Sequence, residues 1–429
     1  MDLVWLKSKW DAGGPTRQEL IEIVIMLSLT WRVLSGVDKV SLESWAGLNE
    51  VLVGSRQGPW FVGGRSIGTK ESKEFVKHKG TLKTIEGKDG DVIDCVDIHQ
   101  QPAFDHPLLK NHTIQMEPSF IRKVTNGELY NAEVFQGWHE DEECPEGTIP
   151  IRHAREDEYY GHRTIPPLAR RKELNIRVDD DVHKGHEYAT THLNSGNYYG
   201  GHAAINIWSP LTMDGDFSLA QIWVVAGHGK ELNTVEAGWK VVSNNKKPKL
   251  FIYWTRDAYV KTGCYNLACP GFVQVNRKFV VGTPLKHVSS YKGTQYDIEL
   301  TIHKDKGNWW LQVQDQAIGY WPQSIFTHLA SKATSISWGG EIYSRGKEGH
   351  HTSTHMGSGH FPSEGYGKAS YFRNIQYMNR NGKFIDAGKK LHRDTTKSSC
   401  YSTSIVSNKN GGNGTQIYFG GPGYSVKCP

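Results

Sequence analysis

The chain has no long apolar run and no strong excess of either charge. Its most apolar stretch near the N-terminus, residues 21–29, is interrupted by Glu22. It is also shorter than the roughly 20 residues of a membrane span, so we expect no membrane-spanning helix. Lys7, Lys9 and Arg17 precede this stretch, which fits either the apolar core of a signal peptide or a buried helix. The net charge is +5 and basic residues do not cluster with aromatic ones, so we expect no nucleic-acid partner.

Several catalytic signatures are also missing. The sequence has no His-Glu-x-x-His motif, no Gly-x-Ser-x-Gly motif and no glycine-rich phosphate loop. Four histidines gather in a segment rich in Gly, Ser and Thr, which is typical of a loop rather than of a zinc site. We therefore predict no metal and no cofactor. The four residues are His350, His351, His355 and His360.

Long helical periods are nearly absent as well, and only residues 324–333 fit a short helix. From about residue 185 onward, short strand-like runs alternate with turns of Gly, Asn, Pro and Ser. In one such run, Ile298, Leu300 and Ile302 alternate with polar residues, which is the two-residue period of a strand. We predict a mainly β protein, with an antiparallel β-sandwich.

Six cysteines indicate disulfides and an oxidising, secretory route. An even count of six allows 15 pairings, and the placement of the residues along the chain favours local pairs. These pairs are Cys95–Cys144, Cys264–Cys269 and Cys400–Cys428. Two segments, beginning at Asn111 and Asn413, fit the N-glycosylation pattern. We therefore expect a secreted glycoprotein.

Two glutamates stand on strand-like segments beside glycines. In residues 234–242, Glu236 shares a face with Gly238, and the alternate residues are apolar. In residues 336–343, Glu341 shares a face with Gly339. A residue without a side chain lets a substrate backbone come close. Two carboxylates facing one cleft can share a proton and activate water, as in acid proteases and many glycosidases.

Rare aromatic and glycine motifs occur in one order along residues 75–429. They include Gln-Ile-Trp-Val-Val at 221–225, Glu-Ala-Gly-Trp at 236–239, Gly-Asn-Trp-Trp-Leu at 307–311 and Trp-Gly-Gly-Glu at 338–341. In these motifs the chain resembles the plant neprosin family of secreted glutamic peptidases. The resemblance implies a β-sandwich catalytic domain and proteolysis at acidic pH, with cleavage after proline. It also implies that Glu236 and Glu341 are the catalytic pair.

The resemblance divides the chain into three parts. Residues 1–74 have no clear counterpart and hold the candidate signal region, residues 75–172 resemble the family's activation peptide and end in a linker, and residues 173–429 resemble the catalytic domain. The linker holds Pro-Pro followed closely by Arg-Arg-Lys at 166–172, which favours processing nearby. We expect a monomeric zymogen whose activation peptide covers the cleft until it is removed.

The expected substrates are peptides or proteins that contain proline, and flat aromatic side chains would hold the proline ring. Candidates are Trp208, Trp223, Trp239 and Tyr343, although aromatic residues more often pack in cores. Two other functions remain open. Glycoside hydrolases also use two carboxylates, and a non-catalytic binding protein can keep the same fold.

Overall fold

The computed structural model describes residues 76–88, 90–123, 136–138, 142–153, 185–242, 247–346, 350–407 and 414–429. The candidate signal region at 21–29, the linker at 166–172 and Asn413 lie outside these residues. Asn111 lies inside them and is exposed. Among the described residues, no helix has the length and hydropathy needed to cross a membrane.

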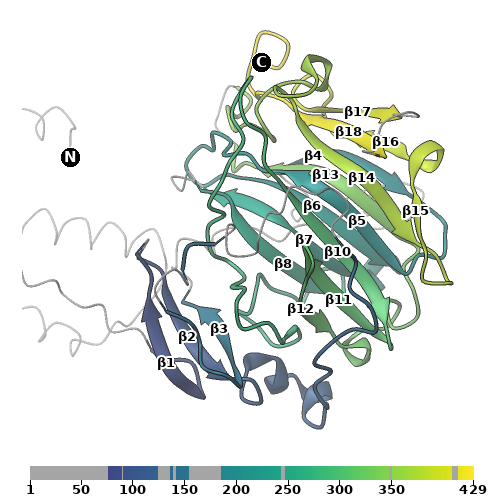
Figure 1. The fold of residues 1–429 in the computed structure, drawn as a ribbon. Coiled ribbons are helices and arrows are strands. Elements are labelled where there is room, and N and C mark those ends of the chain that lie inside the picture. Colours follow the sequence, from purple (N-terminus) through teal and green to yellow (C-terminus); the bar gives the residue numbers. More distant parts are fainter. Residues whose placement is uncertain are drawn as a thin grey trace, which may run out of the picture. The chain divides into compact units, whose positions relative to one another are not determined.

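The described strands form three antiparallel sheets (Figure 1). The first sheet, which we call the N-terminal sheet, has the order β1 (Thr81–Glu86), β2 (Val92–Asp97) and β3 (Thr148–Arg152). The six-stranded sheet has the order β16 (His392–Thr395), β4 (His186–Leu193), β13 (Ser335–Tyr343), β6 (Phe217–Ala226), β7 (Asn233–Val242) and β8 (Lys249–Thr255).

The third sheet has nine strands. Its order is β17 (Ser402–Ser407), β18 (Thr415–Gly420), β14 (Ser370–Met378), β5 (Gly200–Asn206), β10 (Asp297–Asp305), β11 (Asn308–Val313), β12 (Gln316–Trp321) and β9 (Val273–Gln274), and β15 (Phe384–Asp386) pairs with β14. The two large sheets lie face to face as a sandwich, which confirms the predicted fold class (Figure 1).

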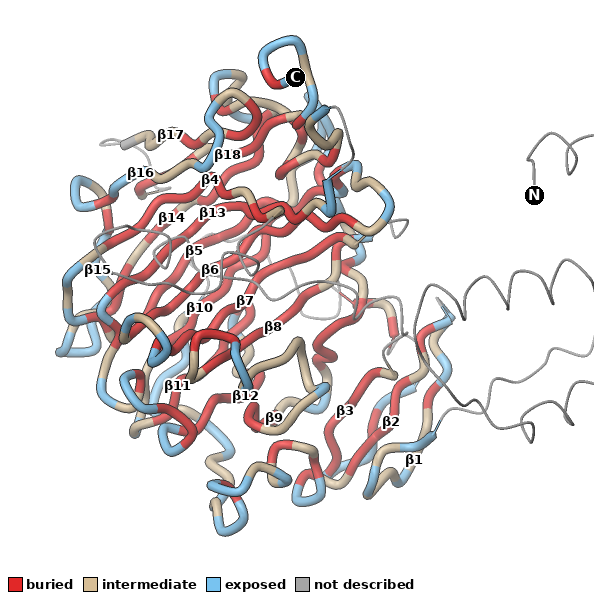
Figure 2. Tube along the Cα trace, turned by 180° about the vertical axis from the view of Figure 1, so that it is seen from behind, coloured by how far each residue is buried: buried red, intermediate tan, exposed pale blue. Residues whose placement is uncertain are grey.

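The main core lies between the two large sheets. Ile298 and Leu300 of β10 meet Ile222 of β6 and Val235 of β7 there, all with no exposed surface. The two-residue alternation explains this arrangement, because every second side chain of a strand points to the same face. In Figure 2 the inner strands of both sheets are buried along most of their length.

The prediction of a short helix at 324–333 is wrong. The structure has only a 3₁₀ turn at Gln323–Ile325. The reason is the side chain of Asn233, whose Oδ1 accepts bonds from the backbone N–H groups of Thr327 at 3.0 Å, His328 at 2.8 Å and Leu329 at 3.1 Å. A helix would direct these N–H groups to carbonyl oxygens one turn earlier. The asparagine instead holds the segment as a loop.

The three predicted disulfides are confirmed. Their Cα–Cα distances are 5.3 Å for Cys95–Cys144, 5.9 Å for Cys264–Cys269 and 5.1 Å for Cys400–Cys428. The first links β2 to the segment that precedes β3, and the second closes a small loop after β8. The third holds the C-terminal residues against the sandwich.

Segments around the N-terminal sheet bind the nine-stranded sheet and the loop that follows β9. The amide of Gln101 bonds both main-chain groups of Gln274, at 3.1 Å and 2.8 Å. Gln136 does the same with Val280, at 2.6 Å and 2.9 Å. These paired bonds replace the main-chain partners that a neighbouring strand would offer. They fix the N-terminal segments to the sandwich at β9 and the loop that follows it.

Candidate active site

Glu236 and Glu341 lie on the same face of the six-stranded sheet, the face that points away from the main core. Both strands pair with β6, where Glu236 lies opposite Trp223 and Glu341 opposite Leu219. Those two positions are four residues apart along β6, which is about 13 Å, and the two outer strands are about 10 Å apart. The glutamates therefore stand diagonally across β6. The predicted face of each glutamate is confirmed.

Gln221 occupies the row between the two glutamates. It pairs with Gly238 on one side and Gly339 on the other. A Cβ atom on Gly238 would lie 2.5 Å from the Cβ of Gln221 and 2.0 Å from the carbonyl oxygen of Ala220. A Cβ atom on Gly339, where φ is +151°, would lie 2.4 Å from the carbonyl oxygen of Ala189. The absence of a side chain at these two glycines is therefore needed for the close packing of the neighbouring strands and of Gln221.

Hydrogen-bond donors surround the carboxylate of Glu236. Its Oε1 accepts bonds from the hydroxyl groups of Tyr259 at 2.6 Å and Thr234 at 2.7 Å, and its Oε2 accepts a bond from Nε2 of Gln221 at 3.0 Å. The side chain has no exposed surface. Burial, followed by the charge of Glu236, holds the pKa of Tyr259 well above its usual range, so the phenol stays a donor.

Glu341 has a different set of neighbours, from β4. Its Oε1 lies 2.6 Å from Nδ1 of His186 and accepts a bond from the hydroxyl of Tyr188 at 3.2 Å. Glu341 is also fully buried. Its position follows from register, because Glu341 pairs with Tyr188 and the adjacent β4 position on that face is His186. The antiparallel pairing of β4 and β13 therefore builds this half of the site.

A lysine and a tyrosine link the two halves. The Nζ atom of Lys240 lies 4.0 Å from the ring centre of Phe217 and 3.9 Å from that of Tyr265. Burial lowers the pKa of Lys240 to about 7, although the charge of Glu341 acts in the opposite direction. Burial, then the charge of Glu341 and more weakly that of Glu236, raises the pKa of Tyr265. Both carboxylates therefore act on one phenol.

Of the four aromatic candidates for substrate binding, two lie on the glutamate face and two lie in the main core. Trp223 and Tyr343 lie on the glutamate face, in a second buried cluster that also holds Tyr259. Trp208 and Trp239 lie in the main core, where Nε1 of Trp239 donates to the carbonyl oxygen of Asn206 at 2.9 Å. Their position does not support a role in substrate binding, because the core separates them from the glutamate face.

Sequence reasoning did not single out five neighbours of the glutamates. Of the five, only Gln221 had a signal in the sequence, because it is a polar residue in the strand-like motif Gln-Ile-Trp-Val-Val. The others come from strands and a loop that only long-range pairing brings together. The five residues are His186, Tyr188, Gln221, Lys240 and Tyr259.

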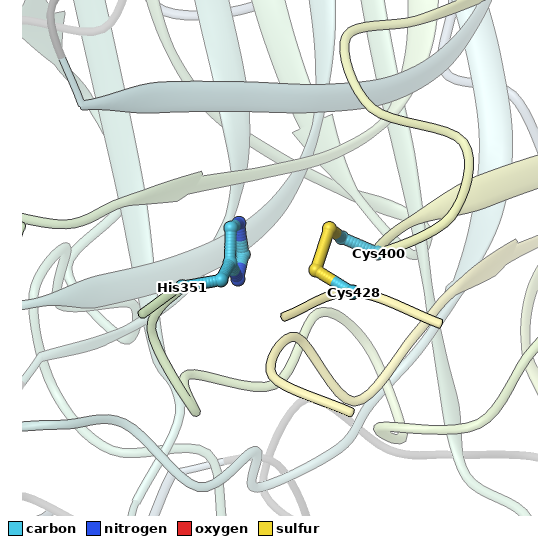
Figure 3. Close-up of side chains that lie close together, drawn as sticks. All are labelled: His351, Cys400 and Cys428. Carbon is cyan, nitrogen blue, oxygen red and sulfur yellow. A yellow bond between two sulfur atoms is a disulfide. The ribbon is translucent and has the colours of Figure 1, made fainter. Parts of the chain in front are cut away.

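The predicted histidine-rich loop makes separate local contacts. Nδ1 of His360 lies 2.8 Å from Glu364, and Nε2 of His351 lies 2.7 Å from Glu187. Figure 3 shows His351 beside Cys400 and Cys428. Because those two sulfur atoms form a disulfide, they are not available as thiolate ligands.

The fold and this face define the class, an antiparallel β-sandwich with two buried glutamates on one sheet. Residues 214–422 match the family model described as Neprosin, and residues 84–192 match the model described as Neprosin activation peptide. The chain belongs to the neprosin family. It is a peptidase made as a zymogen, with its activation peptide ahead of the peptidase domain.

Solved structures with some similarity to this chain include two peptidases and a lectin. A scytalido-glutamic peptidase with a transition-state analogue inhibitor has 8% identity and a TM-score of 0.29, over 54% of this chain and 97% of that one. SCP-B, an eqolisin-family peptidase in complex with the tripeptide Ala-Ile-His, has 8% identity and a TM-score of 0.27, over 54% and 96%. CG-16, a homodimeric agglutinin from chicken liver, has 10% identity and a TM-score of 0.22, over 37% and 96%.

Proposed function

We propose that this chain is a secreted glutamic endopeptidase that uses Glu236 and Glu341 to activate water at acidic pH and cleaves after proline. The observation that carries the proposal is the geometry of the glutamate face. Two fully buried carboxylates stand on either side of Gln221, among hydrogen-bond donors. Burying a carboxylate is costly unless it has such partners. Two buried carboxylates with partners on one face of a sheet are best explained by a catalytic role.

The proposed reaction needs one of the two glutamates ionised and the other protonated. The ionised glutamate takes a proton from a bound water, which attacks the carbonyl carbon of the peptide. The protonated glutamate donates to the carbonyl oxygen and stabilises the tetrahedral intermediate. As the intermediate collapses, the first glutamate gives the proton it took from water to the leaving amine, and the second takes its own proton back from the hydroxyl group of the intermediate. We assign no fixed role to either residue, and activity should fade as the pH rises toward neutral, because the reaction needs one protonated glutamate.

Gln221 and Trp223 fit the substrate part of this proposal. Gln221 lies between the carboxylates, where an amide group can orient a peptide carbonyl. Trp223 shares the face with Glu236 and offers a flat surface for a proline ring. Tyr343 lies beyond Glu341 on β13 and has the same potential on the other side.

The activation peptide supports a zymogen, and both glutamates are fully buried in this form. We propose that its removal opens the glutamate face. The described residues of the peptide bind the nine-stranded sheet and the loop after β9 through contacts such as Gln101 with Gln274. We therefore propose that these contacts anchor the activation peptide to the peptidase domain. The enzyme would then stay inhibited for as long as the peptide remains attached.

The test is cleavage of a proline-containing peptide at about pH 3, read by mass spectrometry. Glu236→Gln and Glu341→Gln keep the side-chain shape and remove the acid–base group, so each should lower the rate by at least about 100-fold. Glu299→Gln is the matched control, because Glu299 is a buried strand glutamate on the nine-stranded sheet. That variant should stay active.

Each outcome has a distinct meaning. Full activity in either dyad variant would contradict the mechanism. Cleavage at other residues would keep the peptidase and change its specificity. No cleavage after the activation peptide has been removed would favour a binding protein, and hydrolysis of a polysaccharide instead would favour a glycosidase.

A further inference from the structure

Three side chains on or next to the strands of the N-terminal sheet converge on one point. His78 lies just before β1, Asp94 in the middle of β2, and His153 directly after β3. Nδ1 of His78 lies 3.0 Å from Oδ2 of Asp94, and Nε2 of His153 lies 2.8 Å from the same oxygen. The centres of the two imidazole rings are 4.8 Å apart. Two imidazoles therefore face a single carboxylate oxygen.

We propose that His78, Asp94 and His153 bind a divalent cation of the zinc class. Two nitrogen ligands and one carboxylate form a donor set that zinc accepts, with a water in the fourth position. Bonds of about 2.0–2.1 Å at a tetrahedral angle place neighbouring ligand atoms about 3.3 Å apart. The three ligand atoms here all lie within 4.8 Å of one another, so a small outward shift of the rings would admit the ion.

The carboxylate is already oriented for this role. Asp94 has no exposed surface, and its Oδ1 accepts a bond from the hydroxyl of Thr84 at 2.7 Å. The backbone N–H of His78 donates to Oδ2 at 2.9 Å. Such outer bonds hold a metal ligand in place and raise the affinity of a site. The ion would replace the hydrogen bonds between the imidazoles and Asp94 with direct bonds.

A cavity of about 200 Å³ opens beside the two histidines and gives room for a water ligand. Its wall includes Arg152, whose guanidinium is paired with Asp91 at 2.7 Å, so its charge is compensated there. The cavity is also lined by residues 265–268 of the Cys264–Cys269 loop, which carries Tyr265 of the glutamate face. An ion bound here would link the three strands of the N-terminal sheet, because its ligands lie just before β1, in β2 and just after β3.

Sequence analysis could not find this site because its ligands are 16 and 59 residues apart along the chain. Only the pairing of β2 with β1 and β3 brings them together. The proposal stands on this geometry and does not depend on the peptidase mechanism.

The test uses the full-length zymogen, stripped with a chelator and titrated with Zn²⁺ or Co²⁺ near neutral pH. We expect one equivalent to bind, with the absorption of tetrahedral Co²⁺ and a higher melting temperature. His78→Ala and His153→Ala should each weaken binding at least about 100-fold, because losing even an outer partner costs about 10–100-fold. His99→Ala is the control, since His99 is an exposed histidine in the turn that follows β2.

His78→Ala guards against a folding artefact, because the side chain of His78 is 28% exposed and less needed for packing than that of His153. The proposal is overturned if the stripped wild-type protein binds no stoichiometric metal. It is equally overturned if both histidine variants bind as the wild type does, since the ion would then occupy another place. Loss of binding in His99→Ala would also contradict it.

Discussion

Replacing Lys240 by methionine should make the folded protein more stable at neutral and acidic pH. Lys240 is only 6% exposed, and its Nζ atom lies between the rings of Phe217 and Tyr265. Burial lowers its pKa from 10.5 to about 7, against the opposing effect of Glu341. Methionine keeps the length and the contacts of the side chain and removes the buried charge.

The size of the effect follows from the pKa. A shift from 10.5 to about 7 corresponds to about 5 kcal/mol at about 1.4 kcal/mol per unit. The two rings also favour the cation, by about 1 kcal/mol each, so about 3 kcal/mol is a fair expectation for the net penalty. Because the two rings stabilise the charged lysine, the folded protein releases this proton at a higher pH, and the window in which stability depends on pH starts higher.

The sign follows from proton binding. A net penalty of about 3 kcal/mol corresponds to a window from about pH 8 to 10.5. In that window the unfolded chain holds a proton on this lysine that the folded chain binds weakly, so wild-type stability rises with pH. Below it both states are protonated, and the folded state carries the full penalty. The methionine variant should therefore be more stable than wild type by about 3 kcal/mol near pH 6, and the difference should vanish above the window.

The assay is denaturant unfolding of both proteins at pH 6, 8 and 10. Subtracting the two curves cancels every other titrating group that the variants share. Lys383→Met is the control, because Lys383 is exposed and should show no pH-dependent difference. A methionine variant that is less stable at pH 6, or a difference that does not change with pH, would refute the reasoning.

Two further predictions concern the backbone and the disulfides. Gly238→Ala should cost at least about 2 kcal/mol of stability, measured as a fall in melting temperature, because the new Cβ would lie 2.0 Å from a carbonyl oxygen of β6; an unchanged melting temperature would contradict the tight pairing of β6 and β7. Replacing both cysteines of Cys95–Cys144, which closes 49 residues, should cost about 4 kcal/mol. The same change at Cys264–Cys269, which closes 5 residues, should cost about 2 kcal/mol, and the reverse order in denaturant unfolding would argue against the loop-entropy explanation.

The sequence alone predicted the faces of the strands well. Val235 and Trp239 point into the core and Glu236 points away from it, as the two-residue alternation requires. This succeeds because side-chain direction in a strand is a local property. The two glutamates were singled out partly for the same reason, since each shares the less apolar face of its strand with a glycine.

The arrangement around the glutamates was beyond local reasoning. β6 lies between β7 and β13, so Gln221 reaches both glycines only through pairing with strands on either side. His186 of β4 lies beside Glu341 of β13, although the two residues are 155 positions apart along the chain. Trp239 and Trp223 look alike in the sequence, yet one lies in the core and the other beside Glu236. Register decides such cases, and no pattern within one strand records its neighbours.

The buried charge of Lys240 also bears on the proposed chemistry. With one glutamate ionised, one protonated and the lysine charged, these three groups sum to zero, which a buried face tolerates best. Without the lysine, His186, whose Nδ1 lies 2.6 Å from Glu341, would be the remaining cationic partner of the pair. Neutrality would otherwise require both glutamates to be protonated, and a protonated pair has no base to activate water. Lys240→Met should therefore lose activity while it gains stability, with the loss greatest at the acidic end of the pH profile. A methionine variant with an unchanged pH profile would show that Lys240 does not help to keep one glutamate ionised and the other protonated.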